Sequence, residues 1–196
     1  MPHINLSAEI PGIGSAFAFR PETAKPMREL AHILLFEPGS EGSLPSRDRE
    51  LIASYVSSRN TCYFCQTSHS AAAASHPEGS LELVAAVCTD PATADISDKL
   101  KALLIIAAHV QGDAKSVTPA MIEQARLQGA TDIEIHDTVL IAAAFCMFNR
   151  YVDGLATWQP SNEEMYRTMG KRLATTGYMA PAQSSGSSSS LSSDGS

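Results

Sequence analysis

The chain contains, from residue 50 to residue 69, the stretch Glu50-Leu-Ile-Ala-Ser-Tyr-Val-Ser-Ser-Arg-Asn-Thr-Cys62-Tyr-Phe-Cys65-Gln-Thr-Ser-His69. It places two thiols, an imidazole and a carboxylate within twenty residues. These groups can activate a thiol, let it attack an oxidant and recycle it as a disulfide. A helix that begins near Cys62 would hold both thiols on one face, one turn apart and close enough to be bridged after local adjustment. The pattern therefore predicts a redox-active CxxC.

The position of His69 indicates which thiol it serves. His69 follows Cys65 by one helical turn, and helical side chains lean towards the N-terminus, so the imidazole is expected to reach back over Cys65. Cys62 is about 10 Å away along the axis, at a rise of roughly 1.5 Å per residue. The partial positive charge of the helix N-terminus should also favour the thiolate, which is the nucleophilic form.

Glu50 is expected on a preceding helix that covers residues 46–58. Asn60 and Thr61 are good N-cap residues for the helix that follows. If the two helices fold back on each other at residues 59–61, the carboxylate could accept a hydrogen bond from His69. This contact would orient the imidazole as the base in a nucleophile–base–orienter arrangement.

Two other interpretations of the cysteines remain open. Cys62, Cys65 and His69 could be three ligands of a structural zinc ion, with Cys88 or Cys146 as the fourth, although neither lies in a knuckle-like context. Alternatively, the cysteines could be small buried apolar residues. A histidine four residues after a paired CxxC favours the redox interpretation over both. We expect Cys88 and Cys146, which lie in apolar runs, to be buried and inert.

Composition predicts one acidic domain in a reducing compartment. The chain has 196 residues and a net charge of −7, which argues against a nucleic-acid or anionic-membrane partner. No apolar run reaches the length of a membrane span, and no secretory signal opens the chain. Four cysteines, two of them in a CxxC, fit the cytoplasm better than a disulfide framework. No motif indicates a metal, flavin or haem cofactor.

The rest of the chain predicts an all-α fold, a compact helical bundle. We expect an irregular N-terminal arm at residues 1–20, one domain at 21–179, and a disordered Ser-rich tail at 180–196. Expected helices cover residues 22–36, 46–58, 62–75, 81–88, 98–111, 119–128 and 131–154. The helix at 98–111 should be buried nearly all round because Ile105 and Ile106 add to its apolar face.

Several other residues carry weaker predictions. The segment 139–148 is apolar on every side, so part of it is expected in a subunit interface. Arg150 is expected either near the thiol pocket or, the preferred interpretation, in an ion pair at that interface. His109 and His136 are expected as core or capping histidines. Residues 47–49 should form a solvated helix start. Three aromatic residues near the CxxC suggest an apolar pocket lining: Tyr55, Tyr63 and Phe64.

The motif resembles that of a known family. Glu50, eleven intervening residues and Cys62-x-x-Cys65-x-x-x-His69 are similar to the signature of AhpD-like alkylhydroperoxidases in the carboxymuconolactone decarboxylase superfamily. The flanking segments Leu44-Pro-Ser-Arg-Asp-Arg-Glu50, Val56-Ser-Ser-Arg-Asn60 and Asn149-Arg-Tyr-Val-Asp-Gly-Leu155 resemble its peroxidase-related branch. The resemblance extends over residues 10–175.

The resemblance implies a function and roles for the motif residues. Cys65 would be the peroxidatic thiol and Cys62 the resolving thiol, with Glu50 and His69 as the proton relay. The expected substrate is hydrogen peroxide or an organic hydroperoxide, the reductant an external dithiol or disulfide-reductase partner, and the assembly a homo-oligomer, trimeric or hexameric. AhpD itself has a second histidine where this chain has Phe64. Two alternative functions are a thiol–disulfide redox sensor and a decarboxylase-like acid–base enzyme on the same scaffold.

Overall fold

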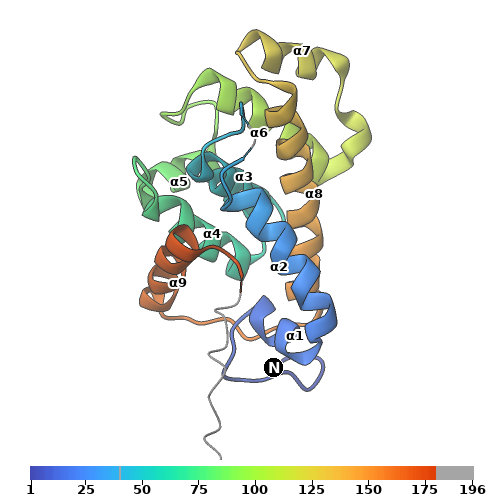
Figure 1. The fold of residues 1–196 in the computed structure, drawn as a ribbon, viewed down its shortest axis with the longest axis vertical. Coiled ribbons are helices and arrows are strands. Elements are labelled where there is room, and N and C mark those ends of the chain that lie inside the picture. The colour runs from blue at the N-terminus through green and yellow to red at the C-terminus, as the bar shows by residue number, and fades with distance from the viewer. Residues whose placement is uncertain (40, 180–196) are drawn as a thin grey trace, which may run out of the picture.

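A computed structural model describes residues 1–39 and 41–179. Within these residues the chain forms α-helices, one short 3-10 helix and no strand, which confirms the predicted all-α class (Figure 1). The helices are α1 (Ile13–Phe19), α2 (Pro21–Leu35), α3 (Ser46–Arg59), α4 (Tyr63–Ser75), α5 (Leu81–Thr89), α6 (Asp98–Asp113), η1 (Ala114–Ser116), α7 (Pro119–Leu127), α8 (Asp132–Gly154) and α9 (Glu163–Thr176). The predicted tail, 180–196, lies outside the described residues.

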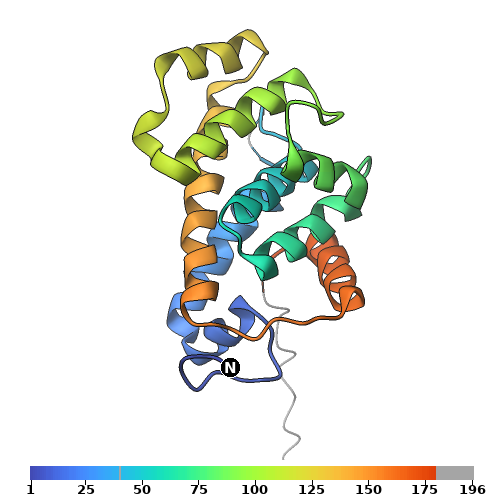
Figure 2. The ribbon, with the colours of Figure 1, turned by 180° about the vertical axis from the view of Figure 1, so that it is seen from behind.

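Helix α3 is the centre of the bundle. All ten residues from Asp48 to Ser57 are buried, and the helix packs against α2, α4, α5, α6 and α8. The long helix α8 runs along one side of the molecule, with α7 near one end and α1 near the other (Figure 1, Figure 2). A central helix of this kind can hold polar side chains away from water, provided that each finds a hydrogen-bonding partner.

The turn between α3 and α4 differs from the prediction by one residue. Cys62 is the N-cap of α4, in an extended conformation, and its side chain makes no capping hydrogen bond. Thr61 has a positive φ of 56°, which reverses the chain at this point. Asn60 uses its side chain for long-range contacts with Asn149 and Gln111 instead of capping. The predicted caps are therefore wrong, whereas the predicted fold-back is confirmed.

Charged residues at the start of α3 also differ from expectation. Asp48 and Arg49 are buried rather than solvated. The Arg49 guanidinium donates to the backbone carbonyls of Ile33, Leu34 and Glu37 at the end of α2, with distances of 2.8–3.4 Å. Helix ends carry carbonyls without intrahelical partners, and Arg49 satisfies those of α2. The buried charge thus joins α2 to α3.

Other predicted helices are present near the expected boundaries, but their burial differs from the prediction. Thr131 and Glu134 form a capping box at the start of α8. Residues 1–20 are not wholly irregular, because they include α1. On α6, Ile106 is buried but Ile105 is 50% exposed, so that helix is not buried all round. Among the described residues, no helix is both long and apolar enough to cross a membrane.

Helix α9 packs closely on α4. An added Cβ at Gly170 would lie 2.4–2.6 Å from the backbone carbonyl group and Cβ of Ala71, so only glycine permits this approach. After α9 the chain turns at Gly177, which has a positive φ of 71°, and returns towards α2. This return brings the end of the described chain to the motif on α3 and α4.

Candidate functional site

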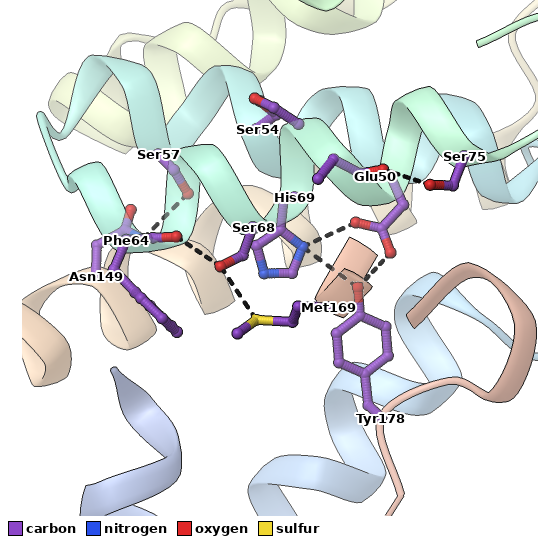
Figure 3. Close-up of polar contacts among 12 residues, drawn as sticks. Glu50, Ser54, Ser57, Phe64, Ser68, His69, Ser75, Asn149, Met169 and Tyr178 are labelled. Atoms are coloured by element: carbon purple, nitrogen blue, oxygen red, sulfur yellow. Dashed lines mark hydrogen bonds and ion pairs between the residues drawn. The ribbon is translucent and has the colours of Figure 1, made fainter. Parts of the chain in front are cut away.

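The Glu50–His69 contact predicted from the sequence is present. His69 Nδ1 lies 2.8 Å from Glu50 Oε2; the Glu50 side chain is buried, at 1% exposure, and that of His69 is largely covered, at 12% (Figure 3). α3 and α4 are also joined by a 2.7 Å hydrogen bond between the hydroxyls of Ser54 and Ser70. The Phe145 ring meets the imidazole edge-on, with ring centroids 4.6 Å apart. With Nδ1 occupied by the carboxylate, Nε2 is the nitrogen left for a second partner.

Tyr178 is a third member of this group that the sequence analysis missed. Its hydroxyl donates to Glu50 Oε1 and lies 3.3 Å from His69 Nδ1 (Figure 3). Burial and the Glu50 carboxylate raise the pKa of Tyr178, so it remains a neutral donor. Its backbone N–H donates to His32 Nδ1 on α2 at 3.2 Å. The sequence analysis predicted no helix after residue 154, so α9 and the turn at Gly177 that positions Tyr178 were missed together.

The two thiols have different environments. Cys62 is fully buried and Cys65 is 4% exposed, and both are free cysteines. The Cys62 thiol donates to the sulfur of Cys65, which lowers the pKa of Cys65 and raises that of Cys62; the imidazole of His69 lowers the Cys65 pKa further. Cys65 is therefore the thiol that ionises first, in agreement with the prediction from spacing.

Asn149 on α8 is another polar neighbour of Cys65 that was not predicted as a site residue. Its side chain hydrogen-bonds Cys65, and this donor also lowers the pKa of that thiol. The amide is held in place from two sides, because it accepts from Asn60 Nδ2 at 2.7 Å and donates to Ser57 Oγ at 3.1 Å. In the sequence, Asn149 belongs only to a segment that flanks the motif in the family resemblance. A single asparagine does not indicate which distant residues it will contact.

A cavity of about 250 Å³ opens beside Cys65 and His69. Its wall is mainly apolar and includes Phe17 from α1, Phe64 from α4 and Phe145 from α8. Of the three aromatic residues expected to line a pocket near the CxxC, Phe64 lines this cavity, whereas Tyr63 lines a separate pocket between α4 and α9 and Tyr55 lines neither. The Phe64 ring also packs against the backbone of Gly12, where a Cβ would lie 2.0 Å from the ring. Phe64 is thus a wall of the cavity, in the place where AhpD would have a polar relay residue.

The remaining candidate residues lie apart from this group. Cys88 and Cys146 are partly exposed, not buried as expected. His109 is half-buried and bonds to Ser116 Oγ at 2.6 Å, as a capping histidine would. His136 is exposed and pairs with the neighbouring Asp137, so it is neither a core nor a capping histidine. Within residues 1–39 and 41–179, no cluster of three metal-ligating side chains supports the zinc interpretation.

Comparison with known proteins gives the same family as the motif. The sequence pattern of the carboxymuconolactone decarboxylase family matches residues 21–88, which include Glu50, Cys62, Cys65 and His69. A search of curated proteins found no match.

Solved structures are similar over most of the chain. One is described as an alkylhydroperoxidase AhpD core, an uncharacterized peroxidase-related protein from Ralstonia eutropha JMP134, with a TM-score of 0.71, 25% identity, and coverage of 82% of this chain and 81% of that one. A peroxidase-related protein from Silicibacter sp. TM1040 has a TM-score of 0.69 and 25% identity, covering 78% and 76%. A protein of unknown function from Agrobacterium tumefaciens shares the fold, with a TM-score of 0.66 and 20% identity, covering 83% and 100%. The chain is therefore similar to the carboxymuconolactone decarboxylase family over residues 21–88, and its fold is similar to those of AhpD-like peroxidase-related proteins.

Proposed function

We propose that the protein is a thiol-dependent peroxidase that reduces hydroperoxides with Cys65. The observation that carries the proposal is the position of this thiol. Cys65 has a lowered pKa, a hydrogen bond to a second thiol and a wall position in an apolar cavity that it shares with His69. A low-pKa thiol that a small molecule can reach, with a resolving thiol beside it, is typical of peroxide-reactive cysteines.

The first step is removal of the Cys65 proton. His69 Nε2 accepts it, while Nδ1–H donates to Glu50 and stabilises the imidazolium that forms. The donation from Tyr178 to the other carboxylate oxygen holds the Glu50 side chain in its orientation towards His69. In this scheme Glu50 and Tyr178 act through the imidazole, and His69 is the group that moves the proton.

The second step breaks the peroxide bond. The Cys65 thiolate attacks the terminal oxygen of ROOH, forms an S–O bond, and gives a sulfenic acid. The leaving alkoxide takes the proton from His69 and departs as ROH, which is water when the substrate is hydrogen peroxide. Sulfur is oxidised by two electrons and the peroxide is reduced by two, so no metal or organic cofactor is needed for the electron balance.

The third step regenerates the thiols. Cys62 attacks the sulfenic acid sulfur, forms the Cys62–Cys65 disulfide and releases water. An external dithiol then attacks the disulfide and leaves as its own disulfide. Because Cys62 is fully buried and Cys65 faces the cavity, we expect the reductant to attack Cys65 through the cavity. The reductant is thus expected to present its dithiol on a small or extended group.

The proposal is tested by peroxide consumption with excess dithiothreitol. Wild type, Cys65→Ser, Cys62→Ser and His69→Gln are compared with hydrogen peroxide and cumene hydroperoxide, with Cys88→Ser as the control for a cysteine outside the site. We expect turnover in wild type and in the control, loss of turnover in Cys65→Ser and Cys62→Ser, and a trapped sulfenic acid on Cys65 in Cys62→Ser.

Two results would reject the peroxidase. A wild-type protein that forms the Cys62–Cys65 disulfide readily but consumes no peroxide would be a thiol–disulfide sensor. If the variant with serine at both Cys62 and Cys65 keeps the enzymatic activity of the wild type, the cysteines are not needed for it. That result would indicate acid–base chemistry by Glu50 and His69, as in a decarboxylase-like enzyme.

A further inference from the structure

The cavity beside Cys65 has two cationic side chains in an otherwise largely apolar wall. Arg28 comes from α2 and Arg172 from α9, and both line the cavity. Among the described residues, the one hydrogen bond of each guanidinium is a long contact, 3.5 Å, with a backbone carbonyl of the C-terminal turn: Arg28 with Tyr178 and Arg172 with Gly177. Arg28 also lies over the ring of Phe17, 4.8 Å from its centroid.

Neither arginine is neutralised by a carboxylate in the part of the chain that the structure describes. No ion pair within 4.0 Å involves Arg28 or Arg172 there. By contrast, Arg47, Arg126 and Arg167 on the surface each pair with an acidic residue. The contrast is notable because the chain has an excess of acidic residues, with a net charge of −7. Carboxylates are plentiful, yet none of the described ones pairs with the cations at the cavity.

The two charges are also close enough to repel one another. Partial burial and the charge of Arg172 both lower the pKa of Arg28. Two guanidinium groups that line one cavity without a described counter-ion repel each other, and an anion bound to both would relieve the repulsion with charge-assisted hydrogen bonds. Arginine is suited to this role because its planar donors match the two oxygens of a carboxylate.

The remaining wall defines the rest of the ligand. Ile13, Phe17, Phe148, Met169 and Leu173 supply an apolar surface, and Cys65 lies on the same cavity. The volume of about 250 Å³ is slightly below the roughly 300–1,000 Å³ of pockets for drug-sized ligands. A single chain of medium length fits these limits better than a two-tailed lipid.

We propose that the cavity binds a medium-chain organic hydroperoxide that carries a carboxylate, with the carboxylate at Arg28 and Arg172 and the peroxide at Cys65. This inference rests on the proposed peroxidase function for its chemical step, which is the same transfer of one oxygen to Cys65 with release of the alcohol. Binding of the carboxylate and the apolar chain does not depend on that step and can be measured alone.

The first experiment uses the unmodified protein and ligands without a peroxide bond. Calorimetric titration compares octanoate with 1-octanol, which has the same chain length but no charge. We expect octanoate to bind about ten- to hundredfold more tightly, the range for a hydrogen bond to a charged group. Equal affinities, or no binding of octanoate, would overturn the carboxylate site without any variant.

Variants then assign the anion to the two arginines. Arg28→Met and Arg172→Met should each reduce the preference for octanoate over 1-octanol about tenfold or more, whereas the charge-retaining Arg28→Lys should keep most of it. The matched control is Lys171→Met, which removes an adjacent cation on α9 that does not line the cavity. If Lys171→Met lowers the preference for octanoate as much as Arg172→Met does, the preference reflects the overall positive charge of α9. The assignment of the carboxylate to Arg172 would then be wrong.

A kinetic comparison separates this inference from the proposed function. Peroxidase turnover is measured with a medium-chain fatty-acid hydroperoxide and with its methyl ester. A higher kcat/KM for the acid, lost in Arg172→Met, supports the substrate class. Turnover of both at equal kcat/KM overturns the class while the peroxidase stands. If neither of these substrates, nor hydrogen peroxide, nor cumene hydroperoxide is turned over but octanoate binds at the arginines, the peroxidase fails and the binding site stands.

Discussion

At the scale of single residues, the main feature of the site is the difference in pKa between its two thiols. Both cysteines belong to one CxxC, yet the Cys62 thiol is the donor and the sulfur of Cys65 the acceptor of their hydrogen bond. This hydrogen bond lowers the pKa of Cys65 and raises that of Cys62, as the proposed roles of nucleophile and resolving thiol require. A hydrogen bond from Asn149 and the charge of His69 also lower the pKa of Cys65. Cys62 is more deeply buried than Cys65.

The hydrogen bond from Cys62 can be removed without removing the nucleophile. In Cys62→Ala the donor is lost, so the pKa of Cys65 should rise and its alkylation by iodoacetamide should move to higher pH, because only the thiolate reacts. In Cys62→Ser a hydroxyl donor remains, and the midpoint should stay low. Peptide mass spectrometry across a pH series distinguishes Cys65 from the other cysteines. Identical midpoints in the two variants would show that this hydrogen bond does not set the Cys65 pKa.

Tyr178 should contribute to stability through its bond to a buried carboxylate. Tyr178→Phe leaves Glu50 Oε1 without its donor, and a hydrogen bond to a charged group contributes about 1.5–3 kcal/mol to the free energy of unfolding. Tyr166→Phe is the matched control, because in the described structure the buried Tyr166 hydroxyl has no hydrogen-bonding partner. Urea unfolding should show a clear loss for Tyr178→Phe and no loss for Tyr166→Phe. Equal effects would mean that the Glu50 contact is not stabilising.

At the scale of helices, α9 determines how closely the C-terminal part of the chain can approach the motif. α4 carries Cys65 and His69, and α9 packs along it because Gly170 lies against the backbone of Ala71. The turn at Gly177 then directs Tyr178 back to α2 and Glu50. The position of the Tyr178 hydroxyl therefore depends on the spacing between α4 and α9.

Gly170→Ala tests this helix contact. The added methyl would lie 2.4 Å from the backbone carbonyl carbon of Ala71, so α9 must shift, at a cost of about 1–3 kcal/mol. Gly112→Ala near the end of α6 is the control, since nothing lies within 4 Å of its added Cβ and alanine favours a helix by up to about 1 kcal/mol. Thermal unfolding should give a lower Tm for the first variant and an equal or higher Tm for the second. A Gly170→Ala variant as stable as wild type would contradict the close packing.

The sequence predicted contacts between neighbouring residues better than contacts between distant segments of the chain. Some local signals were correct: a helix does begin after Thr131, and His69 does influence Cys65 one turn away, although the caps predicted at Asn60 and Thr61 were wrong. Contacts between distant segments were not visible. Arg49 looked like part of a solvated helix start because its partners, the last carbonyls of α2, can be recognised only once α2 and α3 are packed. Tyr178 was missed for the same reason.

At the scale of the whole molecule, one helix surface remains without a described partner. α8 exposes Ala143 and Met147 on its outer side, with Val139 partly covered, although the segment 139–148 looked apolar on every side. Its inner side is covered by α3 and α6. Arg150 is exposed and donates to the carbonyl of Cys146, not to a carboxylate. The homo-oligomer, whether trimer or hexamer, stays a prediction.

The complete site combines residues from the N-terminal half of the described chain with residues from α8, α9 and the C-terminal turn. α1 and α2 supply one wall of the cavity, α3 and α4 the relay and the thiols, α8 supplies Asn149 and Phe145, and the last described residues supply Tyr178. Residues 21–88, which match the family pattern, thus include both thiols, His69 and Glu50. Asn149, Phe145 and Tyr178, which contact these groups, lie outside that range. The C-terminal turn is the segment that can be removed most simply.

A chain that ends after Thr176 should keep its helical core and lose the order of the relay. It retains α9 but lacks the Tyr178 donor and the turn that lines the cavity beside Arg28 and Arg172. Peroxide turnover should fall roughly ten- to hundredfold, part of the 10²–10⁴ that general acid–base catalysis contributes. The control is a chain that ends after Met179, which retains every relay contact described here. Circular dichroism confirms the fold of both, and turnover is measured at several pH values. If both shortened chains turn over peroxide equally, Tyr178 has no part in the relay and His69 is oriented by Glu50 alone.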